Sequence, residues 1–189
     1  MNVIFLDFDG VLDTFHYRTE KDIEEKIKIL SEICKEYNCK VVIEASAKIA
    51  IDEDTMEIDE DCNWVKNIFK CFDKYGIECI GRTPDVKRYD GSSGYIPMWK
   101  EDEIRLYLFR HPEIEHYCVI DDDDLFRLYG YSDLNKVRNH LVRTEDYLGW
   151  MPKREGLLIS HKEKVGKALK EKNELQKIAI KRKMRQKGE

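Results

Sequence analysis

The sequence predicts an α/β fold, a three-layer Rossmann-like arrangement in which helices cover both faces of a parallel sheet. Short apolar runs alternate along the chain with longer amphipathic segments, and polar residues or glycines close the runs. Strands that alternate with helices in this way form parallel sheets with right-handed crossovers. At 189 residues, the chain has a length that suits one domain.

Five short apolar runs are the expected strands. The first of them, Val3-Ile4-Phe5-Leu6, is closed by Asp7 and Gly10, which indicates a buried strand that ends abruptly. The expected strands cover residues 2–6, 40–43, 77–80, 117–120 and 140–142.

The amphipathic segments between these runs are the expected helices. In residues 20–37, Ile23, Ile27, Leu30 and Cys34 recur at helical spacing, and acidic residues come first, as suits a helix N-terminus. Gly76 is a good stop for the second helix. The expected helices cover residues 62–75, 100–110, a short stretch around 123–129, and a polar C-terminal segment with a basic end.

Composition and cysteine spacing exclude several classes of protein. Hydrophobic residues make up 42% of the chain and charged residues 38%, which fits a globular protein rather than a disordered or fibrous one. No apolar run is long enough to span a membrane, and the N-terminal residues do not resemble a secretory signal. The six cysteines form no C-x-x-C pair or zinc-finger pattern, so we expect reduced thiols in a cytoplasmic protein. A disulfide between two of them stays open.

Charge is distributed unevenly along the chain. Residues 160–189 carry 11 Lys or Arg and 4 Asp or Glu, a net charge of +7, whereas the remainder has a net charge of −12. The basic run at residues 181–187 is able to hold a nucleic-acid backbone locally and in a salt-sensitive way. The alternative interpretation is a solvated helix end without a partner.

Two carboxylates follow the first expected strand at a spacing that suits phosphoryl chemistry. In an extended segment residues i and i+2 share a side, so Asp7 and Asp9 are able to face one site, and Gly10 permits a sharp exit. Carboxylates this close need a cation or a shared proton. Magnesium suits oxygen ligands and also neutralises a phosphate. One carboxylate is then placed to attack phosphorus, while the other protonates the leaving oxygen and later activates water.

Polar or small residues also follow the other expected strands. Glu44, Gly81 and Asp121 stand directly after the second, third and fourth strand. In open parallel sheets, ligands bind beyond the carboxyl ends of the strands. We therefore expect these segments to converge with Asp7 on one edge of the sheet.

The D-x-D-G motif at the end of the first strand resembles the signature of the haloacid dehalogenase-like (HAD) hydrolases. Within that superfamily, the sequence looks most like the small HAD domains associated with RNA repair proteins, over most of residues 1–150. Those domains tend to read apolar-SSSWR, G-x-T-P, R-G-x-E-I and an apolar strand ending in D-D. The counterparts here are Val41-Val42-Ile43-Glu44-Ala45-Ser46-Ala47-Lys48, Gly81-Arg82-Thr83-Pro84, Lys100-Glu101-Asp102-Glu103-Ile104 and Val119-Ile120-Asp121-Asp122.

The resemblance implies roles for individual residues. Asp7 is the expected nucleophile and a magnesium ligand, and Asp9 is the expected acid/base, with its backbone carbonyl on the metal. Lys100 matches the basic residue that binds the phosphoryl group. Asp122 matches the direct metal ligand, and Asp121 is a second ligand or an outer-shell partner. The alternative for residues 121–124 is an acidic helix N-terminus, and for Lys100 a solvated lysine.

One position departs from the family pattern. The family usually places Ser or Thr directly after the second strand to donate to the phosphate, but this chain has Glu44 there. An ionised carboxylate has no proton to donate and repels phosphate. Three interpretations are open: Ser46 binds the phosphate instead, Glu44 is turned away or protonated by burial, or the site does not turn over. Lys48 stands where the family has Arg and is a candidate to supply its charge.

The expected function is a magnesium-dependent, cytoplasmic phosphatase that works through an aspartyl-phosphate. Only about ten residues separate Asp9 from the first helix, so we expect a HAD fold with minimal or no cap, open to polymer ends. The only obvious insertion is the loop 81–98, which with Trp99 carries aromatic residues that are able to stack bases. Terminal phosphates of nucleic acids are the first expected substrate; a phosphoprotein phosphatase and a non-catalytic binding or regulatory protein are the alternatives. The expected domains are residues 1–152, HAD-like, and 153–189, a basic helical extension.

Overall fold

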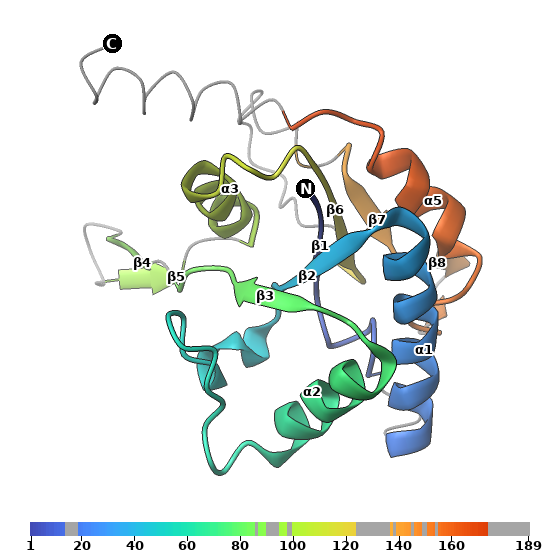
Figure 1. The fold of residues 1–189 in the computed structure, drawn as a ribbon, viewed down its shortest axis with the longest axis horizontal. Helices are drawn as coiled ribbons and strands as arrows, with labels where there is room; N and C mark the ends of the chain where they lie inside the picture. Colours follow the sequence, from blue (N-terminus) through green and yellow to red (C-terminus); the bar gives the residue numbers. More distant parts are fainter. Residues whose placement is uncertain are drawn as a thin grey trace.

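A five-stranded parallel sheet forms the centre of the computed structural model (Figure 1). Its strand order is β3-β2-β1-β6-β7, so β1 lies in the middle. The strands are β1 (Asn2–Leu6), β2 (Cys39–Ile43), β3 (Cys79–Arg82), β6 (His116–Asp121) and β7 (Leu141–Arg143). The structure describes residues 1–13, 19–85, 87–89, 95–97, 100–123, 137, 139–144, 146–148, 151–153 and 155–173.

All five expected strands are present, and the α/β fold class is confirmed. The third strand begins two residues later than expected, at Cys79 instead of Ile77. The reason is the end of the preceding helix, where Gly76 adopts a left-handed conformation with φ 70°. The N–H of Ile77 bonds back to the carbonyl oxygen of Phe72 at 2.9 Å, so Ile77 still belongs to the helix cap.

Helices and caps begin and end close to where the sequence signals place them. Helix α1 (Glu20–Tyr37) starts after Thr19, whose hydroxyl accepts a hydrogen bond from the N–H of Asp22, and ends at Asn38 in the left-handed region. The other helices are α2 (Asn63–Tyr75), α3 (Lys100–Arg110) and α5 (His161–Ala168), and a 3₁₀ helix η1 (Ser46–Ala50) follows β2.

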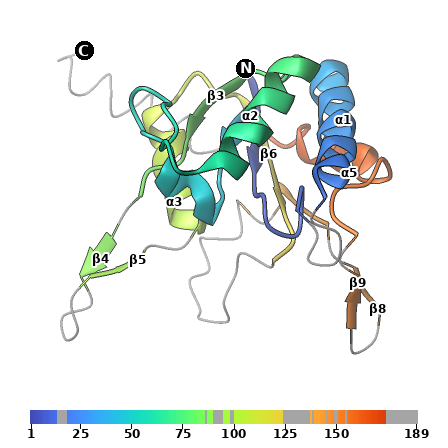
Figure 2. The same ribbon diagram turned by 90° about the horizontal axis from the view of Figure 1, so that it is seen from below.

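The helices form one layer on each face of the sheet, because side chains alternate along each strand. In β1, Ile4 and Leu6 join a buried cluster with side chains of α1, α2 and α5. Val3 and Phe5 face the other way and pack with α3. Figures 1 and 2 show α3 on the opposite side of the sheet from α1, α2 and α5. This arrangement leaves the carboxyl ends of the strands accessible.

Two short antiparallel hairpins extend from this core. The first is formed by β4 (Lys87–Tyr89) and β5 (Tyr95–Pro97), within the loop expected at residues 81–98. The second, β8 (Asp146–Leu148) with β9 (Met151–Lys153), was not expected from the sequence. The side chains of residues 86–99, including the aromatic ones, lie outside the described residues, as do the expected helix from residue 124 onward and the basic run 181–187.

The described part of residues 153–189 packs on the sheet domain. Leu157, Val165 and Leu169 are buried in the same cluster as α1 and β1. The N–H of Leu157 bonds to the carbonyl oxygen of Val11 at 2.8 Å. The side-chain amide of Asn173 donates to the carbonyl oxygen of Ile114, also at 2.8 Å. The domain boundary at residue 152 stays a prediction. No helix among the described residues is long and apolar enough to cross a membrane.

Candidate active site

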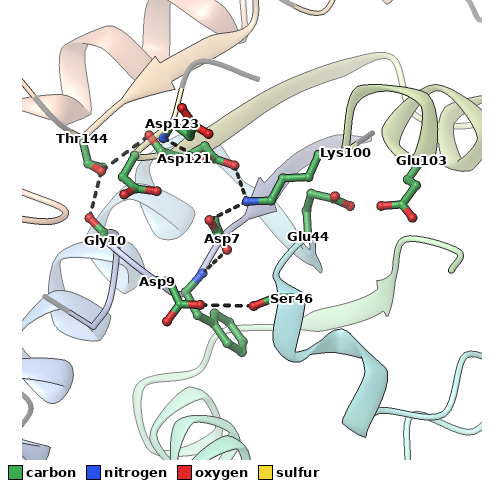
Figure 3. Close-up of polar contacts among 12 residues, drawn as sticks. Asp7, Asp9, Gly10, Glu44, Ser46, Lys100, Glu103, Asp121, Asp123 and Thr144 are labelled. Atoms are coloured by element: carbon green, nitrogen blue, oxygen red, sulfur yellow. Dashed lines mark hydrogen bonds and ion pairs between the residues drawn. The ribbon is translucent and has the colours of Figure 1, made fainter. Parts of the chain in front are cut away.

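Residues from the ends of four neighbouring strands meet at one edge of the sheet (Figure 3). Three of these segments are the ones that the sequence predicts. The fourth expected residue, Gly81, lies within β3 rather than after it, and the fourth segment found here follows β7. Asp7 follows β1, Glu44 follows β2, and Asp121 is the last residue of β6. The fourth segment contributes Thr144 after β7. The N–H of Asp7 bonds to the carbonyl oxygen of Ile120 at 3.0 Å, which continues the β1–β6 ladder into the site and fixes the position of Asp7.

The Lys100 ammonium joins the two buried carboxylates of this edge. Lys100 is the first residue of α3, and its Nζ lies 2.6 Å from Oδ2 of Asp7 and 2.8 Å from Oδ2 of Asp121. The second oxygen of Asp7 accepts the N–H of Phe8 at 2.8 Å, and that of Asp121 accepts the N–H of Asp123 at 2.8 Å. Lys100 therefore lies in the site, and both carboxylates are held in place by hydrogen bonds.

Burial changes the pKa of these groups. Asp7 is only 4% exposed and Asp121 fully buried. Burial raises the pKa of Asp7 to about 7; Lys100 acts against this rise, and the Asp121 carboxylate adds to it. Burial likewise raises the pKa of Asp121, and Lys100 opposes that rise. Burial alone would lower the pKa of Lys100, but the two carboxylates raise it, so the ammonium stays charged. One ammonium does not balance the carboxylates of this edge, which favours a further cation.

The carboxylates of Asp7, Asp121 and Asp122 are close enough to share a metal ion. One oxygen from each lies within 4.8 Å of the others. Three carboxylate oxygens at the end of a sheet are ligands that Mg²⁺ accepts. The residues present therefore fit the expected metal.

Gly10 allows the approach of Asp122 to this cluster. It has φ +71°, a conformation that L-residues avoid, and its amide bonds to the carbonyl oxygen of Asp13 at 2.7 Å. A Cβ at this position would overlap the Asp122 carboxylate. The glycine of the D-x-D-G motif thus provides both the turn and the space that the Asp122 carboxylate occupies.

We expect Gly10→Ala to lower both stability and magnesium affinity. The left-handed conformation costs an L-residue roughly 1–2 kcal/mol, and the added methyl group displaces Asp122. The measurement is thermal unfolding in EDTA and across a magnesium titration. Gly76→Ala is the matched control, because Gly76 also has a positive φ, +70°, but a Cβ atom added there would have no neighbour within 4 Å. If both variants keep the wild-type response to magnesium, the contact between Gly10 and Asp122 has no part in metal binding.

Asp9 and Ser46 contact each other across the mouth of the site. The Ser46 hydroxyl donates to Oδ2 of Asp9 at 3.1 Å, and Ser46 is the first residue of η1. The Asp9 carboxylate is not part of the metal cluster found among the described residues, which agrees with a role for its backbone carbonyl rather than its side chain there. The structure thus brings Asp7, Asp9, Ser46, Lys100, Asp121 and Asp122 to one edge; their roles stay predictions.

Thr144 is a site residue that sequence reasoning missed. Its N–H bonds to the carbonyl oxygen of Asp121 at 3.0 Å, and its hydroxyl donates to the carbonyl oxygen of Gly10 at 3.0 Å. It therefore ties the loop after β1 to the ends of β6 and β7. Its position two residues after the apolar pair Leu141-Val142 is the only signal in the sequence, and it is a weak one.

Glu44 belongs to a buried polar cluster beside the site, which we define as Glu44, Lys48, Thr83 and Glu103. The Thr83 hydroxyl donates to Oε2 of Glu44, and Lys48 Nζ donates to the Thr83 oxygen at 2.9 Å. Lys48 Nζ also forms an ion pair with Glu103 and lies 3.6 Å from Oε1 of Glu44. All four side chains are at most about 7% exposed. In Figure 3 the Glu44 carboxyl points toward Glu103 and away from Asp9 and Ser46.

This cluster bears on the three interpretations of Glu44. Burial raises the pKa of Glu44 to about 8; Lys48 and Thr83 act against the rise, and Glu103 adds to it. The structure therefore agrees with a Glu44 that is turned away from the phosphate and protonated near neutral pH. Lys48 is bound within the cluster, so the suggestion that it supplies a phosphate-binding charge is not supported. It pairs instead with Glu103, which corresponds to the Glu of the family's R-G-x-E-I motif.

The raised pKa of Glu44 predicts a pH-dependent contribution to stability. Its ordinary value is 4.5, so between about pH 4.5 and 8 the folded state binds more protons than the unfolded state. This contribution is fully present below pH 4.5 and is lost as the pH rises through 8. Across that window, a rise of one pH unit removes at most about 1.4 kcal/mol of stability, or a few degrees of Tm for a chain of this size.

We expect Glu44→Gln to remove this dependence. The Tm of the wild type, relative to that of the variant, should fall between pH 5 and pH 8 in EDTA. Glu57→Gln, which alters an exposed carboxylate, is the control and should differ from the wild type by a constant amount. A pH-independent difference for Glu44→Gln would mean that Glu44 is ionised throughout.

The parallel sheet, the D-x-D-G turn and the carboxylate cluster around Lys100 define a HAD-type hydrolase. Residues 3–153 match the family model described as the HAD domain in Swiss Army Knife RNA repair proteins, and the chain belongs to that family. The resemblance found in the sequence is thereby confirmed. No curated protein and no solved structure matches the chain.

Proposed function

We propose that this protein is a cytoplasmic, magnesium-dependent phosphatase that acts through an aspartyl-phosphate on Asp7. The observation that carries the proposal is the setting of Asp7, a buried carboxylate held by Lys100 and the Phe8 amide within reach of two further carboxylates. The six free cysteines agree with the cytoplasmic assignment.

The magnesium ion is assigned to the carboxylates of Asp7, Asp121 and Asp122, with the backbone carbonyl of Asp9 as a further oxygen ligand. When bound, the ion supplies positive charge that offsets these carboxylates and draws phosphoryl oxygens toward them. Lys100 supplies the second positive charge, from the side of α3.

In the first chemical step, an oxygen of Asp7 attacks phosphorus and the bond between phosphorus and the leaving oxygen breaks. Lys100 contacts Asp7 directly, so it orients the nucleophile and neutralises charge on the phosphoryl group. Asp9, in its protonated form, gives its proton to the leaving oxygen. The Ser46 hydroxyl donates its single proton to the Asp9 carboxylate. When Asp9 is protonated, we propose that this hydroxyl donates to the phosphate instead.

In the second step, the ionised Asp9 takes a proton from water, and the oxygen of that water attacks the phosphorus. The bond to the Asp7 oxygen breaks, and inorganic phosphate and free Asp7 are regenerated. The same side chain thus serves first as acid and then as base, which requires its position to be maintained by contacts such as the one to Ser46.

Terminal phosphates of nucleic acids are the proposed substrate class. Three observations support it: the family description refers to RNA repair, residues 160–189 are basic, and the 13 residues between β1 and α1 are too few for a cap domain over the site. A site without such a cap accepts the end of a polymer.

The test is phosphate release from a panel of substrates, with magnesium and with EDTA. Oligonucleotides with a 5′- or 3′-phosphate are compared with phosphoserine peptides. We expect magnesium-dependent release from the oligonucleotides, and weaker oligonucleotide binding when the basic residues of 181–187 are changed to Gln. Preferred release from the peptides would replace the nucleic-acid substrate by a phosphoprotein. Stabilisation by phosphate without release from any substrate would make the chain a binding protein.

A further inference from the structure

A cavity of about 710 Å³ lies between α1 and α2 and begins at the active site. Its volume is within the range of small-molecule sites, about 300–1,000 Å³. Figures 1 and 2 both show α1 and α2 side by side. The described lining residues come from the loop after β1 and from the facing sides of the two helices: Asp9, Asp13, Glu20, Ile23, Glu24, Trp64, Asn67, Ile68, Lys70 and Cys71.

Asp9 connects the cavity with the reacting centre, because its side chain both lines the cavity and accepts a hydrogen bond from Ser46. On the proposed mechanism, Asp9 protonates the leaving oxygen. The leaving group therefore starts within hydrogen-bond reach of Asp9, at the opening of this cavity. An in-line displacement requires the attacking oxygen of Asp7 to lie on the other side of the transferred phosphorus from this leaving group.

The charge of the lining excludes a second phosphate. Four carboxylates line the cavity, and Lys70 is the one cation among its described lining residues. Glu24 stays ionised, because hydrogen bonds from Lys74 and Tyr75 hold its pKa near 2. Such a lining repels a polynucleotide backbone but accepts groups that present N–H donors.

The apolar part of the lining suits a flat ring. Trp64 is 43% exposed, and its indole is held edge-on to the Phe8 ring, at 5.9 Å between centroids and 77° between planes. Ile23, Ile68 and Cys71 lie along the same cavity. Glu20 reaches across from α1 and accepts the side-chain amide of Asn67 at 3.5 Å. An aromatic surface thus lies beside carboxylate acceptors.

We infer that this cavity binds the leaving group, and that it selects one nucleoside whose base carries an amino group. The base stacks on Trp64, and its amino N–H groups donate to carboxylates of the rim such as Glu20. The next phosphate of a strand remains outside the cavity. A small alkylammonium would satisfy the carboxylates but leave most of the apolar surface of Trp64, Ile23 and Ile68 uncovered. This inference rests on the proposed phosphatase function and names the part of the substrate that the site recognises.

The test is kcat/KM for nucleoside 5′- and 3′-monophosphates, with phenyl phosphate and phosphoethanolamine as reference substrates. We expect adenosine, cytidine and guanosine monophosphates to exceed uridine monophosphate by roughly tenfold. Trp64→Leu should lower kcat/KM for all nucleotides by roughly tenfold, while hydrolysis of phosphoethanolamine, which has no ring to stack, changes little. Glu20→Gln should reduce the preference for amino-bearing bases and improve hydrolysis of nucleoside 3′,5′-bisphosphates. Glu57→Gln, outside the cavity, is the control.

Nucleotide kcat/KM values no higher than that for phosphoethanolamine would overturn the inference and leave the phosphatase proposal intact. Binding of free adenosine to the Asp7→Asn variant gives a measurement that needs no turnover. We expect adenosine to bind this variant, and to bind more weakly once Trp64→Leu is added. If no phosphomonoester is hydrolysed, the proposed function fails, and adenosine binding alone then decides whether the cavity is a nucleoside site.

Discussion

Asp7→Asn is expected to abolish phosphate release, with a loss of turnover on the order of 10⁴-fold or more. The amide has no ionised oxygen to attack phosphorus, so the covalent intermediate does not form. Steady-state phosphate release with magnesium and the best substrate of the panel measures the effect. Asp9 and Lys100 are unchanged in this variant, so the loss reports on the nucleophile itself.

The control for this variant is its folded stability. Burial raises the pKa of Asp7, which means that the ionised form is costly in the folded protein. Asn has the same shape, but its single oxygen accepts from only one of the Phe8 amide and Lys100, while Lys100 keeps its bond to Asp121. We therefore expect the variant to fold, with a Tm close to that of the wild type in EDTA. Asp54→Asn, at an exposed position, is the matched substitution and should retain full activity. Turnover of Asp7→Asn above about 1% of the wild type would contradict the covalent mechanism.

Lys48→Met is expected to have the largest effect on stability, a loss of about 3–5 kcal/mol in the free energy of unfolding at pH 7. The substitution leaves the Glu103 carboxylate buried without the ammonium that pairs with it, and Thr83 loses the hydrogen bond that Lys48 donates to it. Urea unfolding measures the loss.

An exposed ion pair provides the matched control for Lys48. Lys40 Nζ lies 2.5 Å from Oε1 of Glu78, and the two side chains are 37% and 61% exposed. Lys40→Met should therefore cost at most about 1 kcal/mol. Adding Glu103→Met to Lys48→Met should recover part of the lost stability, since it removes the carboxylate that Lys48→Met leaves unpaired. A loss below about 1 kcal/mol for Lys48→Met would show that the buried cluster is not charged.

Much of the fold is predictable from local patterns. The run Val3–Leu6 ends at Asp7 both in the sequence and in the sheet, because a buried strand tolerates no charge until it reaches the sheet edge. Helix α1 begins and ends at the residues expected. The hairpin β8–β9 was missed because its three-residue strands carry no extended apolar run. Ile77 was placed in a strand because apolarity alone does not distinguish a strand from a helix cap.

The residues of the candidate site are predictable as strand-end residues, but their contacts are not. Asp7 and Asp121 are recognisable because parallel strands share one carboxyl edge. Lys48 and Glu103 are 55 residues apart in the sequence, and neither segment contains a pattern that predicts their pairing. Thr144 acts through backbone contacts, which leave no compositional signal. These contacts arise from tertiary packing, so they had to be observed.

The buried cluster gives a physical account of the departure at Glu44. A carboxylate at this position would be harmful if it faced the phosphate, but contacts with Thr83 and Lys48 direct it toward Glu103 and away from Asp9 (Figure 3). Glu44 stands where the family usually has Ser or Thr. Among the described residues, it is the hydroxyl of Ser46 that contacts Asp9. The chain thus retains a hydroxyl at the mouth of the site despite the change.

Thermal unfolding with magnesium and beryllium fluoride tests the central claim most directly. Beryllium fluoride bound to a carboxylate mimics an aspartyl-phosphate, so the measurement needs no knowledge of the substrate. At about 100 times the dissociation constant, the wild type should gain ~2.7 kcal/mol, or several degrees of Tm. We predict this gain in Tm only with magnesium and only when Asp7 is present. An equal gain in Asp7→Asn, or no gain in either protein, would contradict a phosphoryl-accepting Asp7.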